Sequence, residues 1–297
     1  MLAWGGVCNE QDLLTAVPPV AHCPAPSYSD AQVLGGYVHK SDNPATTLIV
    51  FIHGLGGNAR QTWTSPTGAF WPDLVYGDPT FAQPDVLIVD YETAIRGEQT
   101  TAAVALSVDG FLRRQSVWTY QSIVLVAHSL GGIIARQIIV NNPAHAGKVK
   151  LMYLLAAPMG GSMLANYANN LGLAGAIVRD LRSIEEGSFL SNLVNQWNSV
   201  VGHNNIPTYC AVEGRDASAV GATRSVSRAL DSTSSAGSPS ARTRSVAPAR
   251  VVDYASSALL CNRKIVSHSA HDHESIAKPA SADDGVHVEF RNAFLAR

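Results

Sequence analysis

A serine flanked by small residues is the first candidate for chemistry in this chain. Ser129 lies in the sequence AHSLGG at 127–132, between an apolar run and a pattern typical of a helix. Small residues two positions before and after a serine allow the tight strand-to-helix turn of a nucleophile elbow. At such a turn the hydroxyl lies beside free N–H groups of a helix N-terminus, which favour developing negative charge. We therefore predict that Ser129 is a nucleophile for acyl transfer. The Leu130 N–H is predicted to stabilise the oxyanion, the negatively charged oxygen that forms when a nucleophile attacks a carbonyl.

A glycine-rich loop could supply the second donor to this oxyanion. The sequence HGLGG at 53–57 directly follows the apolar run TLIVFI at 47–52. Enzymes with a nucleophile elbow take a second N–H group from the loop after an earlier strand. Because glycines let the backbone come close to a reacting carbonyl, we predict that the Leu55 N–H is this donor and that His53 braces the turn.

A histidine near the C-terminus is the predicted general base. His273 stands in DHESIAKP at 272–279, after a predicted strand at 264–266 and before the last predicted helix. The order serine, acid, histidine along the chain is the one that this type of site requires. His268 and His271 are competitors, but both are expected to be exposed loop residues. The three histidines resemble part of a zinc-binding run, yet no second cluster supplies the remaining ligands, so no metal and no cofactor are expected.

The acid that orients the histidine must lie between the serine and the histidine. The apolar run PTYCAV at 207–212 leads into Glu213, Gly214, Arg215 and Asp216. A strand followed by Gly-x-Asp favours Asp216, whose carboxylate would hold the imidazole tautomer and stabilise the imidazolium. Glu213 remains the alternative.

Short apolar runs alternate with longer mixed segments along most of the chain. The runs are apolar on both alternating faces, as expected for strands that are buried on both sides. Strands that alternate with helices indicate an α/β fold with a mainly parallel central sheet and helices on both faces. The sequence predicts strands at 33–39, 47–52, 86–89, 123–127, 151–155, 207–212 and 264–266, and helices at 131–141, 189–200 and 286–295.

Two segments differ from this alternating pattern. Residues 1–44 are predicted to be an irregular segment with a first strand, and 45–297 the main domain. Within that domain, 217–249 consists almost wholly of Ala, Ser, Thr, Arg, Gly and Pro. Because this composition cannot bury a core, the segment is predicted to be a disordered insertion.

The overall composition excludes several classes of protein. Of the 297 residues, 46% are hydrophobic and 15% are charged, and the formal net charge is −2, which indicates a globular protein that does not bind nucleic acid. No apolar run is long enough to span a membrane, and the first basic residue is Lys40, so neither a transmembrane helix nor a signal peptide is expected. The predicted location is cytoplasmic, with four reduced cysteines, although Cys8 and Cys23 could form a disulfide if the protein is exported.

Four motifs together resemble those of lipase-like serine esterases of the α/β-hydrolase superfamily. They are HGLGGNARQTW at 53–63, AHSLGG at 127–132, APMGGS at 157–162 and DHESIAKP at 272–279. The resemblance covers most of 45–297 apart from the insertion, and it points to the SERAC-type proteins and, more distantly, the GPI inositol deacylases. It implies an ester or acyl-lipid substrate and leaves contact with a membrane surface open. It also slightly favours Glu213 as the acid.

These residues together predict hydrolysis of a carboxylic ester. Ser129 would form the acyl intermediate, His273 would take and return the proton, and Asp216 or Glu213 would orient the imidazole. The same residues would serve a thioesterase, an amidase or an acyltransferase. Outside enzymes, the alternative is a weakly active signalling or interaction module, because a fold does not settle a function.

Overall fold

A seven-stranded sheet forms the centre of the structure, in the order β1-β3-β2-β4-β5-β6-β7. β1 pairs antiparallel with β3, and every other neighbouring pair in the sheet is parallel. The predicted mainly parallel sheet is thereby confirmed. The strands are β1 (Leu34–His39), β2 (Thr47–Ile52), β3 (Asp85–Asp90), β4 (Ser122–His128), β5 (Val149–Leu155), β6 (Thr208–Glu213) and β7 (Ile265–His268).

This computed structural model describes part of the chain. The predicted insertion at 217–249 and residues 1–33 and 42–44 of the predicted N-terminal segment lie outside the described residues. No helix in the described part combines the length and the apolar character that crossing a bilayer requires. The described residues are 34–41, 45–93, 97–162, 165, 175–182, 184, 188–202, 206–215 and 251–297.

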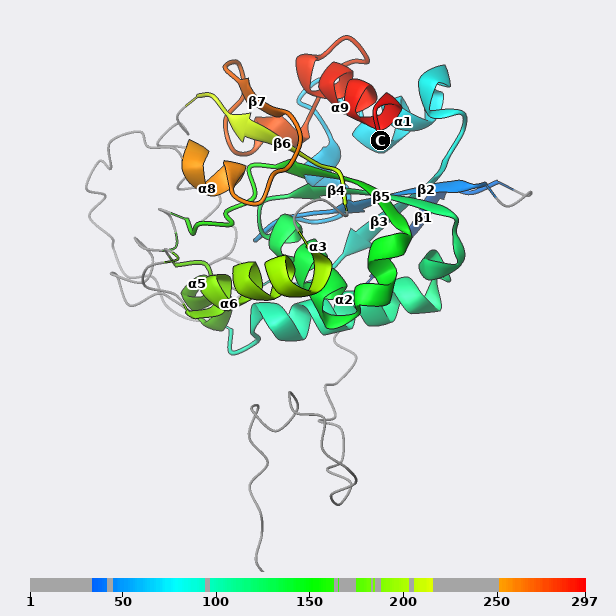
Figure 1. Ribbon diagram of the computed structural model, residues 1–297. Helices are drawn as coiled ribbons and strands as arrows, with labels where there is room; N and C mark the ends of the chain where they lie inside the picture. Colours follow the sequence, from blue (N-terminus) through cyan, green and yellow to red (C-terminus); the bar gives the residue numbers. More distant parts are fainter. Residues whose placement is uncertain are drawn as a thin grey trace, which may run out of the picture. The chain divides into compact units, whose positions relative to one another are not determined.

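Helices cover both faces of the sheet (Figure 1). One face carries α2 (Thr101–Arg114), α3 (Leu130–Asn141), α5 (Ala176–Asp180) and α6 (Ser188–Gln196), and the other carries α1 (Trp71–Gly77) and α9 (Gly285–Leu295). A further helix, α8 (Tyr254–Ala258), precedes β7. The short turns are the 3-10 helices Gln61–Trp63, Pro79–Phe81, Val117–Thr119, Pro143–Gly147 and Ser275–Ala277, and the π-helical turn Trp197–Val201 that continues α6.

The sheet separates two apolar cores. In β2, Ile49 and Val50 both have no exposed surface, although one belongs to the core under α1 and α9 and the other to the core under α2 and α3. This burial on both faces is the reason why the strands read as continuous apolar runs. Each observed strand lies within two residues of its predicted run.

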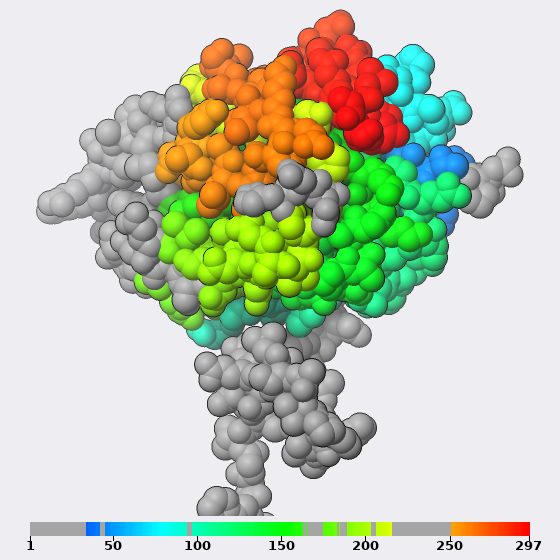
Figure 2. Space-filling model, in the orientation of Figure 1, coloured from blue at the N-terminus to red at the C-terminus, as the bar shows by residue number. Residues whose placement is uncertain are grey.

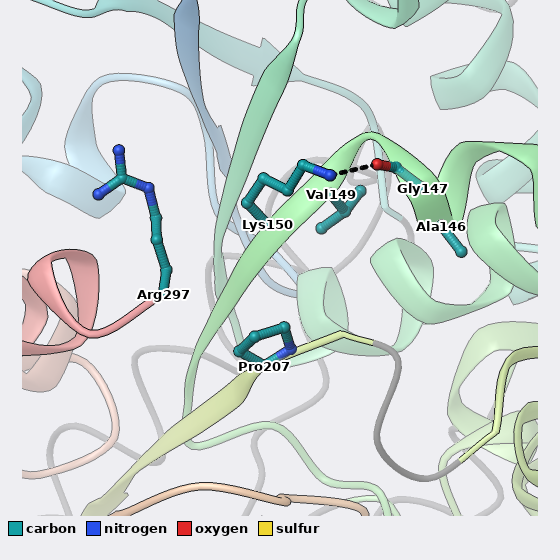
Figure 3. Close-up of a pocket in the computed structure, with 6 residues that line it drawn as sticks. All are labelled: Ala146, Gly147, Val149, Lys150, Pro207 and Arg297. Carbon is teal, nitrogen blue, oxygen red and sulfur yellow. Dashed lines mark hydrogen bonds between the residues drawn. The ribbon is translucent and has the colours of Figure 1, made fainter.

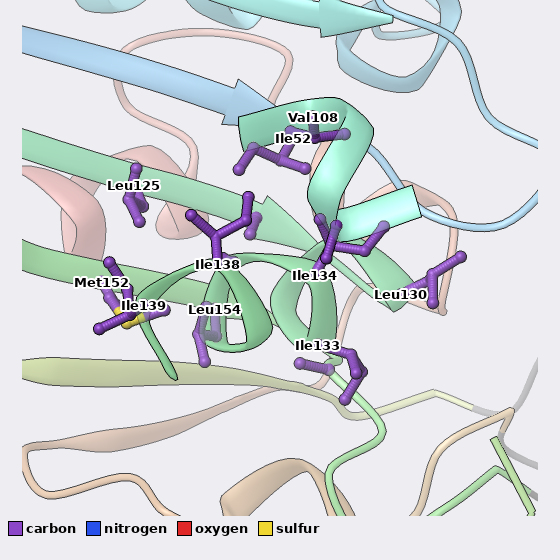
Figure 4. Packing of buried hydrophobic residues seen from close by; sticks show 14 of the residues in the cluster. Ile52, Val108, Leu125, Leu130, Ile133, Ile134, Ile138, Ile139, Met152 and Leu154 are labelled. Atoms are coloured by element: carbon purple, nitrogen blue, oxygen red, sulfur yellow. The ribbon is translucent and has the colours of Figure 1, made fainter. Parts of the chain in front are cut away.

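The helix that follows the serine motif is anchored by an isoleucine-rich face. Ile134 and Ile138 of α3 are buried in the same core cluster as Leu125 of β4 and Met152 of β5 (Figure 4). Burying a side chain of this size contributes about 1.5–3 kcal/mol. α3 is therefore packed against β4 and β5 of the sheet.

A disulfide links the last two strands of the sheet. Cys210 in β6 is bonded to Cys261, which precedes β7, and their Cα atoms lie 6.1 Å apart. The prediction that these cysteines are reduced is therefore wrong, because parallel pairing of β6 with β7 brings them together. Disulfides persist mainly in oxidising compartments, and the cytoplasmic location stays a prediction. Cys8 and Cys23 lie outside the described residues.

The C-terminal part of the chain closes one end of the sheet. In the space-filling view, the segment that begins at residue 251 lies beside α9 on the visible face (Figure 2). An ion pair joins the two, because Lys264 Nζ lies 2.9 Å from Glu289 Oε2. The start of β7 is thus tied to α9 through the residue that directly precedes the strand.

Candidate active site

Ser129 lies on the tight turn between β4 and α3. It directly precedes the first residue of α3, and its backbone has φ 53° and ψ −126°. A positive φ is uncommon for a residue other than glycine and costs roughly 1–3 kcal/mol, so the surroundings must hold it in place. The Ser129 N–H donates to Leu155 O at 2.9 Å, and the Gly132 N–H donates to Ser129 O at 2.9 Å.

Two glycines let this turn and the glycine-rich loop after β2 pack together. A Cβ on Gly131 would collide with the carbonyl oxygens of Ile52 and His53. A Cβ on Gly54 would lie only 2.7 Å from Ser129 Cβ, closer than two carbon side chains can approach. Glycine at both positions therefore places the loop directly against the serine.

Hydrogen bonds fix the peptide between Gly54 and Leu55. Gly54 O accepts from the Gly57 N–H at 3.1 Å and from His53 Nδ1 at 2.9 Å. Because the N–H of a trans peptide points opposite to its C=O, these bonds direct the Leu55 N–H away from the His53 ring. Neither this N–H nor that of Leu130 has an acceptor within the described part of the chain. Both remain the predicted oxyanion donors.

His273 is the histidine that faces Ser129. Its Nε2 lies 3.0 Å from Ser129 Oγ, within reach for proton transfer. The prediction that the two competing histidines are exposed loop residues is wrong for His268, which is the buried last residue of β7. His271 lies in a loop as predicted, but it is partly buried, and its Nε2 lies 3.5 Å from the Asp284 carboxylate.

Glu213 is the acid that contacts the imidazole of His273. Its side chain has no exposed surface, and its Oε2 lies 3.1 Å from His273 Nδ1. Its Oε1 accepts from the Val252 N–H at 2.6 Å. The predicted contact of Asp216 with His273 is thus corrected to Glu213, and Asp216 itself lies outside the described residues. As the last residue of β6, Glu213 already reaches the histidine, so no turn at Gly214 is needed to bring a carboxylate there.

The loop after β7 is held at several points. The N–H groups of Gly214 and Arg215 both donate to His271 O, at 3.2 and 3.1 Å. Asp272 Oδ1 accepts from the Ser275 N–H at 2.9 Å and from the Ser275 Oγ at 2.7 Å. These contacts account for the acid and the serine three positions apart in the DHESIAKP motif.

Two contacts at this site had no counterpart in the sequence prediction. The first is the bond from the Val252 N–H to Glu213, and the second is a contact of 2.7 Å between His128 Nε2 and His273 O. The first joins the end of β6 to a residue that follows the predicted insertion, so no local pattern in the sequence pointed to it. No signal pointed to the second, because its partners lie far apart in the sequence.

A pocket lies at the end of the sheet that is opposite to Ser129. Val149 begins β5 and Pro207 directly precedes β6, so the pocket is at the amino ends of these strands, whereas Ser129 follows the carboxyl end of β4. Ligands of open α/β sheets bind at the carboxyl ends. No group of three or more His, Cys, Asp or Glu residues suited to a metal occurs in the described part of the chain. The pocket is lined by Ala146, Gly147, Val149, Lys150, Pro207 and Arg297 (Figure 3).

Several solved structures are similar to this chain. A lipase from Bacillus licheniformis in its mature form is 18% identical, with 65% of this chain and 76% of that chain covered and a TM-score of 0.44. A phospholipase from Legionella pneumophila is 18% identical, with 59% of this chain but 40% of that chain covered and a TM-score of 0.47. A structure from work on carboxylesterases of Nitrososphaera gargenis is 13% identical, with 92% of this chain and 96% of that chain covered and a TM-score of 0.50. Curated protein sequences gave no match.

The fold and a family model agree. The model of the alpha/beta hydrolase family matches residues 49–291, which span β2 to α9 and therefore the serine, the glutamate and the histidine of the site. The mainly parallel sheet with helices on both faces is the fold of that family. This chain belongs to the alpha/beta hydrolase family.

Proposed function

We propose that this protein is a serine hydrolase that cleaves carboxylic esters through an acyl-Ser129 intermediate. The proposal rests on two consecutive contacts, Ser129 Oγ to His273 Nε2 at 3.0 Å and His273 Nδ1 to Glu213 Oε2 at 3.1 Å. Acyl transfer needs a nucleophile, a base and an orienting acid connected in this order. Membership of a family of hydrolases supports the same reaction.

The first half of the reaction forms the acyl intermediate. Ser129 Oγ attacks the ester carbonyl carbon while His273 Nε2 takes the hydroxyl proton, and the Glu213 carboxylate stabilises the resulting imidazolium. The carbonyl oxygen becomes an oxyanion, to which the N–H groups of Leu55 and Leu130 donate. When the tetrahedral intermediate collapses, the bond to the alkoxide breaks and His273 returns the proton, so an alcohol leaves.

The second half of the reaction uses water. His273 Nε2 takes a proton from a water molecule, and the water oxygen attacks the acyl carbon of the ester on Ser129. Collapse of this second tetrahedral intermediate breaks the bond to Ser129 Oγ, which takes the proton back from His273. The carboxylic acid is released and the enzyme is restored, with no cofactor involved in either half.

The position of Ser129 favours this chemistry over that of an ordinary serine. It stands at the N-terminus of α3, where helix N–H groups and the helix dipole stabilise negative charge. Removing one oxyanion donor costs roughly 10²–10³-fold in rate in enzymes of this type, so these N–H groups contribute strongly.

Covalent labelling tests the proposal. A fluorophosphonate probe should label Ser129 alone, and Ser129→Ala should abolish both labelling and turnover of p-nitrophenyl esters. Ser199→Ala, which changes an exposed serine after α6, is the matched control and should behave like the wild type. Undiminished ester turnover by Ser129→Ala would contradict the proposal. A panel of short-chain esters, long-chain esters, thioesters and amides then separates an esterase or lipase from a thioesterase or an amidase.

A further inference from the structure

His128 makes a contact that the proposed reaction does not use. It is the last residue of β4, directly before Ser129, and it is 7% exposed. Its Nε2 lies 2.7 Å from the backbone carbonyl oxygen of His273, and the two imidazole rings are centred 4.9 Å apart. A carbonyl oxygen only accepts a hydrogen bond, so His128 Nε2 must carry a proton and donate it.

Burial keeps the ring of His128 neutral. Desolvation is the largest cause that lowers the pKa of His128 well below its ordinary value, and the nearby ring of His273 lowers it further. Lys278 and His53, the other titratable groups that act on it, have the same effect, while the bond to the His273 carbonyl opposes them. A neutral ring with its proton on Nε2 has a lone pair on Nδ1. This nitrogen faces Gly54, because a Cβ added to Gly54 would lie 3.2 Å from it.

The contacts of His128 and Ser129 with His273 form a closed ring. One link is the bond between the Ser129 hydroxyl and the imidazole of His273, at 3.0 Å. The other link joins the His128 side chain to the backbone of the same histidine. A bond to the imidazole alone fixes the tip of the side chain and lets the backbone move. The second bond fixes the other end of the residue as well.

We propose that His128 is a positioning residue that holds the backbone of His273 at the distance from Ser129 that proton transfer requires. This inference rests on the proposed function, in which His273 is the base. His128 touches no reacting atom and acts through His273. Its neutral ring also places no charge beside His273 when that ring becomes an imidazolium, whereas a cation there would disfavour the imidazolium.

Two substitutions at position 128 test the proposal. His128→Leu removes the donor, and His128→Gln keeps an N–H donor at a similar distance from the backbone. Active sites are first titrated with a fluorophosphonate, and kcat is then measured for each titrated site. His128→Leu should lower this kcat about 10²-fold, a loss that a misplacement of about 1 Å can cause, and leave KM nearly unchanged. His128→Gln should recover most of the loss.

These outcomes separate positioning from general stability. A purely structural role would lower the melting temperature or the titrated fraction but leave kcat per titrated site unchanged. That result for His128→Leu, or equal kcat values for the Leu and Gln variants, would overturn the proposal. Ester turnover that survives in Ser129→Ala contradicts the proposed function, whereas turnover lost in Ser129→Ala and retained in His128→Leu contradicts this inference alone.

A measurement on the unmodified protein keeps the test independent of folding of the variants. NMR of protein labelled with ¹⁵N-histidine reports the proton on each imidazole nitrogen. His128 should remain the neutral Nε2–H tautomer from about pH 5 to pH 8, where an ordinary histidine titrates. A proton on Nδ1, or protonation of both nitrogens in this range, would overturn the proposal.

Discussion

Replacing Glu213 with glutamine tests the acid of the site with almost no change in the size of the side chain. Glu213 Oε1 accepts from the Val252 N–H at 2.6 Å, so the oxygen of a glutamine amide must stay on that side. The NH₂ group then occupies the position of Oε2, which lies 3.1 Å from His273 Nδ1. Because an amide N–H donates, His273 Nδ1 must accept, and the ring proton moves to Nε2. His273 Nε2 can then no longer take the proton of Ser129.

The expected loss is larger than that of one weakened hydrogen bond. An inverted tautomer in such a triad lowers kcat by ~10⁴, which corresponds to about 5.5 kcal/mol in the activation free energy. An ordinary hydrogen bond contributes about 1 kcal/mol, which is equivalent to a loss of less than tenfold in rate. The size of the effect therefore shows whether Glu213 sets the tautomer or merely packs beside the ring.

The assay measures kcat on a p-nitrophenyl ester for Glu213→Gln and for Asp216→Asn. The first variant should lose nearly all activity while retaining the wild-type melting temperature, and the second should remain close to the wild type. Asp216→Asn is the matched control, because it removes the carboxylate three positions later in the sequence, which the sequence analysis favoured as the acid. A loss of less than tenfold in the kcat of Glu213→Gln would refute the assignment of Glu213 as the acid. A loss of kcat in Asp216→Asn that exceeds the loss in Glu213→Gln would refute it as well.

Two further predictions concern stability. Burial raises the pKa of Asp78, but hydrogen bonds, first that of the Thr80 N–H, outweigh it and lower the pKa to about 2. The ionised carboxylate therefore stabilises the fold above the unfolded pKa of about 3.8, and this stabilisation is lost as the pH falls toward 2. Asp78→Asn should lower the free energy of unfolding, measured in urea, by about 2 kcal/mol at pH 7. Below pH 4 the difference from the wild type should become progressively smaller. Reduction of the Cys210–Cys261 disulfide should lower it by about 4 kcal/mol, because the bond spans 51 residues of chain. The variant with alanine at both cysteine positions should have the unfolding free energy of the reduced protein, and a reductant should not change it. Equal unfolding free energies with and without the bond would contradict this prediction.

The parts of the fold that the sequence predicted are those with a local signal. Buried strands such as β2 and β4 are continuous apolar runs, because both of their faces lie in a core. Helix α2 was missed, although Val104, Val108, Phe111 and Leu112 are buried at helical spacing and the Thr100 side chain caps its first turn. These signals were present in the sequence, and a complete search for helical periodicity would have found the helix.

The acid and the disulfide depend on spatial relations that a single sequence does not contain. Glu213 and a residue three positions later are both plausible at the end of β6, and the direction of each side chain decides between them. The register Glu213↔His268 places the end of β6 beside the loop after β7, which brings Glu213 to His273. The same pairing of β6 with β7 brings Cys210 to Cys261.

The position of the predicted insertion is compatible with an intact site. Arg215 and Val252, which lie on either side of the predicted insertion in the sequence, both make hydrogen bonds close to the acid. At one end the Arg215 N–H donates to His271 O at 3.1 Å, and at the other the Val252 N–H donates to Glu213 Oε1 at 2.6 Å. The entropic cost of closing a flexible loop grows only with the logarithm of its length, by about 0.6 kcal/mol for each doubling. The carboxylate that orients the imidazole therefore keeps its backbone donor whatever length of chain separates the two.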